Sequence, residues 1–136
     1  MSLNDIPVTV VAPDSGLSGN AWPLMLEISD MVQQLLETGE TAAIDLSALP
    51  LTPEDKAWLK ARLGRGQISV SLEAEGLSTL DETACPGVWW VTHRDPQERV
   101  QSEFIEVTTA PDLIQAHPDD IKTGHEYLKG IVSELS

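Results

Sequence analysis

The sequence is poor in cysteine and in apolar runs long enough to cross a membrane. A single Cys, at position 85, excludes an intrachain disulfide framework and an all-cysteine zinc site. No apolar run approaches the roughly 20 residues that span a bilayer. Residues 1–11 contain no basic residue and no A-x-A site, which secretory signal peptides carry. We therefore expect a cytoplasmic protein without membrane insertion.

Basic residues are scarce and unevenly placed. Eight Lys and Arg face 22 Asp and Glu, which gives a net charge of −14. Residues 1–55 hold nine acidic residues and no Lys or Arg, and residues 101–136 hold seven acidic and two basic ones. Nucleic acid is a disfavoured partner because phosphate binding needs clustered Lys and Arg. The acidic balance is typical of an ordinary soluble surface, or of a face that attracts a basic partner segment.

The sequence also lacks the common catalytic and metal-binding motifs. His93, His117 and His125 are isolated, without the spacing of a zinc site. The pair Gly64 and Gly66 ends a helix and forms no phosphate-binding loop, and there is no G-x-S-x-G elbow. The sequence therefore predicts no metal site, no cofactor and no catalytic residue.

Helical patterns occupy much of the first half. Apolar residues recur at helical spacing from about 22 to 38, after Asn20 as a possible cap, and Gly39 ends the run. A short apolar run at 42–46 indicates a buried strand. Thr52 is placed to cap a second helix over 53–63, with Asp55 as the acid of a capping box. In residues 1–21, a short extended piece at Ile6–Val11 is followed by a turn-rich loop. We expect this segment to be either an edge strand or a mobile lead-in.

The second half is rich in strand patterns. Alternation at 67–73, a return at 77–83, the break at Cys85-Pro86-Gly87, and runs at 88–92 and 100–108 predict strands joined by short turns. A helical turn over 109–116 and a helix over 119–135 follow. We expect a single α+β domain over 1–136, with a mostly antiparallel sheet of four to five strands and helices packed on one face. One parallel pairing, of 42–46 with 67–73, stays open.

The stretch from 82 to 91 is the most distinctive part of the chain. Trp89 and Trp90 point to opposite faces of one strand. One can enter the core, and the other must face solvent, a covering helix or a partner, where Trp is a common anchor. Glu82 and Glu106 lie on a solvent face or, if burial separates their pKa values, do acid–base work. Cys85 has either a packing role or a redox or ligand role.

Four stretches carry a family resemblance. They are L-P-L-T-P-E-D at 49–55, L-G-R-G-Q-I at 63–68, E-T-A-C-P-G-V-W at 82–89, and I-E-V at 105–107 followed by Pro111. In this combination they resemble the C-terminal conserved region of the HupH/HyaF hydrogenase expression/formation proteins, over about 41–112. Proteins of that family usually have a longer chain, with further residues before this region.

The resemblance implies an accessory protein of [NiFe]-hydrogenase maturation, without established catalytic residues. Such a protein would act as a chaperone for the iron–sulfur small subunit before its twin-arginine export, binding that subunit, its signal peptide or other maturation proteins. Two alternatives stay open: a redox or metal-handling protein acting through Cys85, and a hydrolase or transferase using Glu82 and Glu106. The residues that we expect to contact a partner are Glu82, Thr83, Cys85, Pro86, Gly87, Trp89, Trp90 and Glu106.

Overall fold

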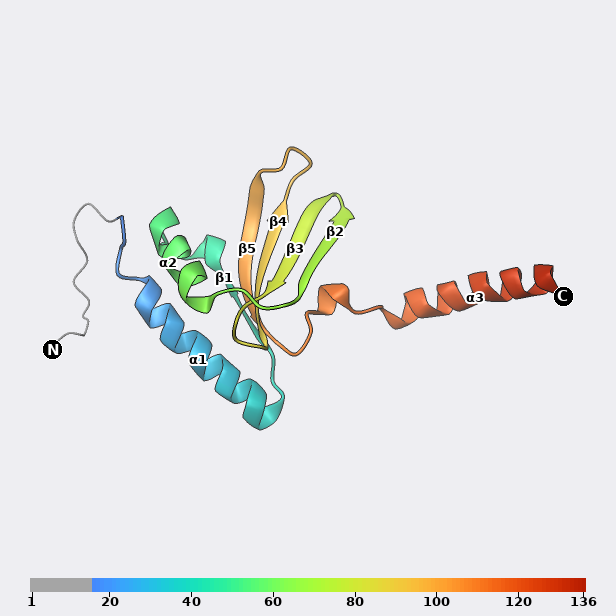
Figure 1. Cartoon of the computed structure of the whole chain (residues 1–136), viewed down its shortest axis with the longest axis horizontal. Coiled ribbons are helices and arrows are strands. Elements are labelled where there is room, and N and C mark those ends of the chain that lie inside the picture. The colour runs from blue at the N-terminus through green and yellow to red at the C-terminus, as the bar shows by residue number, and fades with distance from the viewer. Residues whose placement is uncertain (1–15) are drawn as a thin grey trace.

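Five antiparallel strands form one sheet in a computed structural model that describes residues 16–136 (Figure 1). The extended piece expected at Ile6–Val11 lies outside the described residues. In chain order the elements are α1 (Ala21–Thr38), β1 (Ala42–Asp45), the 3-10 helix η2 (Leu46–Ala48), α2 (Pro53–Leu63), β2 (Ser69–Ala74), β3 (Gly76–Glu82), β4 (Val88–Arg94), β5 (Val100–Val107), the 3-10 helix η3 (Asp112–Ile114) and α3 (Pro118–Leu135).

The strand order is β1-β5-β4-β3-β2, and every neighbouring pair is antiparallel. The predicted α+β fold with a mostly antiparallel sheet is thereby confirmed. The parallel pairing of 42–46 with 67–73 is wrong, because β1 and β2 form opposite edges of the sheet. The apolar pattern explains the choice. Ile44 of β1 lies opposite Ile105 of β5, whereas β2 would offer Ser69, Ser71 and Glu73 on that face.

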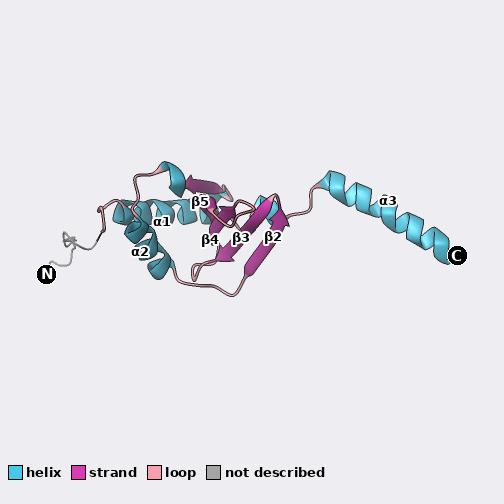
Figure 2. Cartoon of the chain, turned by 90° about the horizontal axis from the view of Figure 1, so that it is seen from above, coloured by secondary structure: helices cyan, strands magenta, loops and turns pink. Residues whose placement is uncertain are grey.

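Two helices cover one face of the sheet. α1 and α2 lie together beside β1, β5 and β4 (Figures 1 and 2). The residues buried between these layers include Leu24 and Ile28 of α1, Leu59 and Leu63 of α2, Ile44 of β1, Val88 and Trp90 of β4, and Ile105 and Val107 of β5. Burial of this apolar surface is the main favourable term that holds the helices to the sheet.

Local signals at the helix ends match their predicted positions. Thr52 accepts a hydrogen bond from the Asp55 amide at 3.0 Å, and the Asp55 carboxylate accepts one from the Thr52 amide at 2.9 Å. This is the predicted capping box, with Pro53 in the first turn. Gly39, at φ 76°, ends α1 as predicted. Asn20 stands at the start of α1, but its side-chain amide donates to the Pro50 carbonyl at 2.9 Å and does not cap the helix.

The face of the sheet opposite α1 and α2 carries a second apolar cluster. Leu80, Trp89 and Val91 are buried there. Val70, Leu72, Phe104 and Ile114 are only partly buried and pack around them. Below, these seven residues are called the open face. Among the described residues, only the η3 segment, through Ile114, packs on this cluster from outside the sheet.

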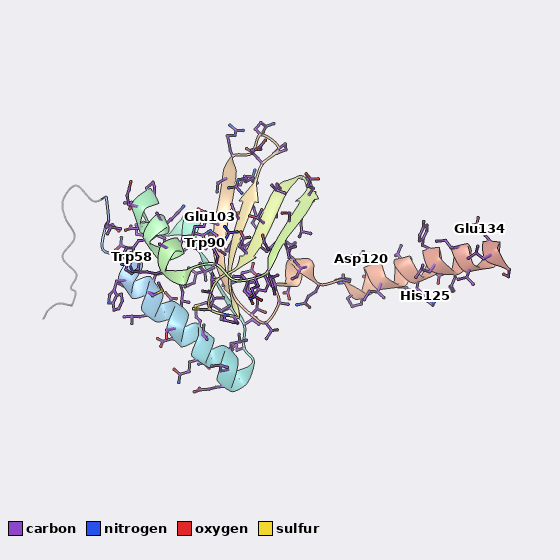
Figure 3. The ribbon with its side chains drawn as sticks, viewed as in Figure 1. Trp58, Trp90, Glu103, Asp120, His125 and Glu134 are labelled. Carbon is purple, nitrogen blue, oxygen red and sulfur yellow. The ribbon has the colours of Figure 1, made fainter. Side chains whose placement is uncertain are left out.

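α3 forms over the predicted range but buries none of its residues. Figure 1 shows it extending away from the sheet, and Figure 3 places Asp120, His125 and Glu134 along its length. The expectation of helices packed on one face therefore applies to α1 and α2.

Candidate functional site

The loop between β3 and β4 is a tight, anchored turn. The Cys85 carbonyl accepts a hydrogen bond from the Val88 amide at 3.0 Å. Pro86 and Gly87 occupy the two central positions, and Gly87 has φ 93°. This pattern is a type II β-turn, in which Pro sets the first central residue and Gly supplies the positive φ of the second. The distinctive P-G pair is thus explained by backbone geometry.

Contacts on both sides hold this loop in place. The Ala84 amide donates to the Leu63 carbonyl at the end of α2, at 2.9 Å, and the Thr108 amide donates to the Gly87 carbonyl at 2.9 Å. Thr83 is buried, and its hydroxyl bonds the backbone of Cys85. The loop therefore joins α2 to the residues after β5, and only its outer residues, Cys85 and Pro86 among them, reach solvent.

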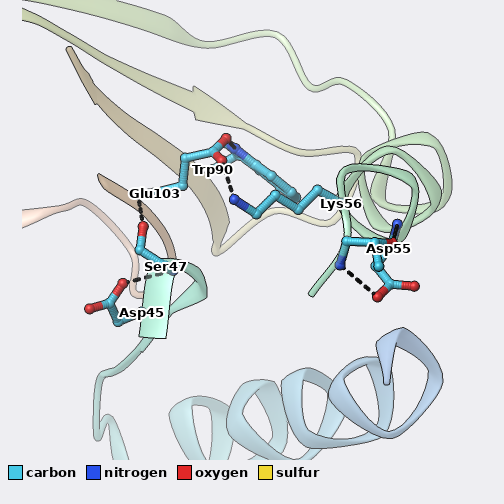
Figure 4. A network of polar contacts seen from close by, with 7 residues as sticks. Asp45, Ser47, Asp55, Lys56, Trp90 and Glu103 are labelled. Carbon is cyan, nitrogen blue, oxygen red and sulfur yellow. Dashed lines mark hydrogen bonds and ion pairs between the residues drawn. The ribbon is translucent and has the colours of Figure 1, made fainter. Parts of the chain in front are cut away.

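Neither of the two adjacent tryptophans is available as an exposed anchor. Trp89 and Trp90 are each 2% exposed. Trp90 faces α2, and its indole N–H donates to Glu103 Oε2 at 3.1 Å (Figure 4). Trp89 faces the other way, donates to the Thr108 carbonyl at 3.1 Å, and is covered by the open face's own side chains. The structure bears out the alternative in which both indoles are covered, Trp89 by η3 and the neighbouring strands and Trp90 by α2. Contact of either indole with a partner stays a prediction.

Glu103 is the centre of a polar network beside Trp90. Its other carboxylate oxygen lies 3.1 Å from Lys56 Nζ of α2, and its backbone amide donates to the Ser47 hydroxyl at 3.2 Å (Figure 4). The network joins α2, η2, β4 and β5. Since every partner belongs to this chain and the network satisfies the N–H of the buried Trp90, we assign it to stability.

Glu82 and Glu106 do not converge. Both are paired across the sheet with Trp89, Glu82 from β3 and Glu106 from β5. The β4 strand therefore stands between them, about 10 Å from strand to strand. They also line different cavities. This arrangement does not support a hydrolase or transferase that uses the two carboxyl groups as a pair.

Glu106 instead faces Asp112 in a groove of about 510 Å³ on the side of the sheet that α1 and α2 leave free. The groove is lined by Thr41, Ala42, Ala43, His93, Glu106, Thr108, Asp112 and Leu113. Below it is called the acidic groove. Burial, and secondarily the charge of Asp112, raises the pKa of Glu106, while His93 partly opposes the rise. Among the described residues no Lys or Arg lines the groove, so His93 is the basic side chain beside its carboxylates.

The acidic groove lies at an edge of the sheet, since β1 is the outermost strand. On the other side of β1 is a smaller depression of about 200 Å³, lined by Glu27, Asp30, Met31, Gln34, Glu40, Thr41 and Ala42. The β1 edge thus has carboxylates on both sides. Sequence reasoning missed Asp112, Glu27 and Asp30 as site residues, because only the tertiary arrangement brings them beside β1.

A third cavity, of about 530 Å³, lies where α2 meets β2 and β3. It contains Glu82 and Asp81, but also Lys60 and Arg65. Asp81 accepts a hydrogen bond from the Ser69 hydroxyl at 2.5 Å. Acidic and basic side chains line this cavity together and partly cancel each other's charge. It is therefore expected to attract a basic segment less strongly than the acidic groove does.

Cys85 is a free, exposed thiol on the turn. Among residues 16–136, no three His, Cys, Asp or Glu side chains come together as a set that could hold a metal ion. In the same described part of the chain, none of the helices combines the length and apolarity that a membrane crossing requires.

Comparisons with known proteins agree with the resemblance seen in the motifs. Residues 19–135 match the model of the HupH hydrogenase expression protein, C-terminal conserved region. The chain is 32% identical over 118 residues to the hydrogenase expression/formation protein HoxQ of Azotobacter vinelandii, covering 85% of this chain and 42% of that protein. It is 25% identical over 124 residues to the hydrogenase-1 operon protein HyaF of Escherichia coli K12, covering 91% of this chain and 42% of HyaF.

A solved structure shows the same fold. The hydrogenase expression protein HupH from Thiobacillus denitrificans is 50% identical, with a TM-score of 0.83 over 87% of this chain and 98% of that one. The chain spans less than half the length of the curated relatives HoxQ and HyaF. Motifs, fold and both kinds of comparison lead to one conclusion: this chain belongs to the HupH hydrogenase expression protein family, as its C-terminal conserved region.

Proposed function

We propose that this chain is a non-catalytic accessory protein of [NiFe]-hydrogenase maturation in the cytoplasm, where it binds the iron–sulfur small subunit or its twin-arginine export signal before assembly. Family membership supports the maturation role, since its relatives are named hydrogenase expression/formation proteins. The acidic groove supports the choice of a basic segment as the ligand.

The convergence of Glu106 and Asp112 is the observation that carries this proposal. Two carboxylates held close enough to raise one pKa repel each other. A guanidinium placed between them would relieve that repulsion and donate charge-assisted hydrogen bonds to both carboxylates. The exposed Leu113 and Ala43 beside them offer apolar contact. Acid next to apolar surface suits a segment in which arginines are followed by apolar residues.

The β1 edge offers a backbone docking mode for the same segment. An edge strand presents unpaired N–H and C=O groups, and an extended peptide can add to it as a further strand. Successive side chains of such a peptide point to opposite faces. One set would then reach Glu106 and Asp112, and the other would reach Glu27 and Asp30. Of the paired arginines of the export signal, one would then contact carboxylates on one face of β1 and the other would contact carboxylates on the opposite face.

The test is a pull-down of the purified small-subunit precursor by the full chain, with and without its signal peptide. We expect retention of the intact precursor, and about tenfold weaker retention by the variant Glu106→Gln with Asp112→Asn. The matched control is Asp81→Asn, which removes a carboxylate from the cavity beside α2. Equal retention by all three proteins would overturn the proposal.

The Cys85 alternative is tested in the same assay. Cys85 lies exposed on a tight turn, away from the acidic groove, so we expect Cys85→Ala to bind the precursor normally and to support hydrogenase activity. Normal binding combined with lost hydrogenase activity would instead favour a redox or metal-handling role.

A further inference from the structure

α3 presents an apolar stripe that nothing in the described structure covers. Ile121, Leu128, Val132 and Leu135 are 58%, 57%, 64% and 82% exposed. They recur at steps of seven, four and three residues, which places them along one side of the helix. Lys122, Glu126, Lys129 and Ser133, at steps of four, three and four, form a polar side about 120° around the helix from this stripe. A stripe of this kind is the signature of a helix that packs on an apolar surface.

The same chain has an apolar surface that lacks a covering helix. The open face keeps Val70, Leu72, Phe104 and Ile114 partly exposed, over a buried layer of Leu80, Trp89 and Val91. Strands that bury one face under helices commonly leave polar residues on the other. Here the second face is apolar at its centre, so it too has the character of a surface that packs on another element.

The segment between η3 and α3 keeps α3 away from its own open face. Gln115 and His117 have extended backbone, with ψ 136° and 142°. Pro118 favours that conformation at His117, because its ring disfavours a helical residue before it. Extended residues on both sides of Ala116 therefore carry the chain outward, as Figure 1 shows for α3.

We propose that α3 of one copy packs its apolar stripe on the open face of a second copy, and that the exchange is reciprocal. A two-fold dimer formed by exchange of an identical element is a low-cost route to self-association. The 18 residues of α3 make a helix about 27 Å long, which is comparable to the eight residues of β5, about 27 Å when extended. The helix and the face thus match in length as well as in character.

The area also favours reciprocal exchange over docking on an unrelated protein. A helix about 27 Å long and about 10 Å wide covers roughly 270 Å² in projection. Counting both contacting surfaces, one docked helix buries about 540 Å², and two reciprocal helices bury about 1,100 Å² before side-chain relief is added. Stable interfaces begin near 1,200 Å². One helix alone falls well short of that, whereas a symmetric pair approaches it.

The first test measures the molar mass of the full chain in solution against concentration, by light scattering after size exclusion. We expect a dimer that dissociates on dilution. Val132→Glu should weaken it about tenfold or more, since the new carboxylate would enter an apolar contact. Ser133→Glu adds the same charge one residue later on the polar side and should leave the dimer unchanged.

A second pair of variants addresses the open face. Leu72→Glu places a carboxylate on the open face, and Ser71→Glu places it one residue earlier on the other side of β2. We expect only Leu72→Glu to weaken the dimer. Circular dichroism of each variant shows whether the fold is kept. A wild-type chain that is monomeric at every concentration, or a dimer that weakens equally with each control, would overturn the proposal.

Cross-linking separates exchange from closure of α3 on its own sheet. Two proteins are made on a Cys85→Ser background, one with Leu128→Cys and the other with Leu72→Cys, and a short bis-maleimide is added to their mixture. Since each chain holds one thiol, no intrachain link can form. We expect a mixed cross-linked dimer containing both chains. If neither the mixture nor either variant alone gives a cross-linked dimer, the proposed exchange of α3 between two copies is wrong.

Salt distinguishes this interaction from the proposed binding of a basic segment. Two copies that each carry net charge −14 repel, so added salt should strengthen the dimer by screening that repulsion. Binding at the acidic groove should weaken under the same conditions. Loss of either interaction would therefore leave the other one testable.

Discussion

The indole N–H of Trp90 donates a hydrogen bond to Glu103 Oε2 at 3.1 Å, while Lys56 approaches the other oxygen of the same carboxylate, also at 3.1 Å. Glu103 thus accepts the hydrogen bond of the buried Trp90 indole and forms an ion pair with Lys56 of α2. We expect Glu103→Ala to lower the free energy of unfolding by about 1–3 kcal/mol, since it leaves the buried N–H without a partner. Chemical denaturation measures this. Gln101→Ala, at an exposed position of β5, is the control and should change stability little.

The turn after Cys85 makes a second prediction. Gly87→Ala should cost about 1–2 kcal/mol of stability, because an alanine at φ 93° is strained even though an added Cβ would meet Leu35 and Thr108 only at ordinary van der Waals distances of 3.6 and 3.8 Å. Gly130→Ala is the matched control, at a helical position with nothing nearby. It should raise the helicity of α3 and leave the unfolding midpoint of the sheet domain unchanged. If both variants melt like the parent, the turn is not under the constraint described.

Asp55 predicts a dependence of stability on pH. Burial raises its pKa, but hydrogen bonds from Ser18 and Thr52 outweigh that effect and hold the pKa below its ordinary value of 3.8. A lowered folded-state pKa contributes stability that is present above the unfolded pKa and lost as the pH falls through the folded one. Asp55→Asn should therefore cost about 1–2 kcal/mol at pH 7 and less near pH 2.

The measurement is urea denaturation of the parent and Asp55→Asn at both pH values. Glu54→Gln, the exposed neighbour in the same first turn, should show a much smaller change. A cost for Asp55→Asn that stays the same from pH 7 to pH 2 would contradict the assignment of its stabilising form to the carboxylate.

The pH dependence of stability that we expect from Glu106 has the opposite sign to that of Asp55. Burial, then the charge of Asp112, raises its pKa above the ordinary 4.5. The folded state therefore holds this proton more tightly than the unfolded state, and stability falls as the pH rises from the unfolded to the folded pKa. Compared with the parent protein at the same pH, Glu106→Gln should therefore have a more favourable free energy of folding at pH 7 than at pH 4. Asp112→Asn should lower the pKa of Glu106 in a carbon-13 NMR titration, without removing the part due to burial. No change in that titration would show that the two carboxyl groups do not interact.

Local signals in the sequence predicted most of the fold. Thr52, Pro53 and Asp55 predicted the start of α2, and Gly39 predicted the end of α1, because each satisfies backbone groups within a few residues of itself. Strand alternation predicted the antiparallel sheet. The position of β1 depended on which edge could accept Ile44, which is a property of distant residues, and so the sequence left it open.

The candidate site was predicted less well, for the same reason. Trp89 and Trp90 were correctly placed on opposite faces, but their burial depends on η3 and α2, which lie far away in the sequence. Glu106 was identified as a candidate, whereas its neighbour Asp112 was not. The helix over 119–135 was also predicted, but the spacing of its apolar residues does not say which surface covers them.

The most direct test of the account is the affinity of the full chain for the small subunit's twin-arginine signal peptide, measured calorimetrically at low and high salt. The account predicts binding that weakens as salt rises, because exposed charges are screened. The variant Glu106→Gln with Asp112→Asn should bind about tenfold more weakly at low salt, equivalent to about 1.4 kcal/mol, with a smaller salt dependence. Equal affinity of the two proteins, unchanged by salt, would contradict the claim that the acidic groove holds a basic partner segment.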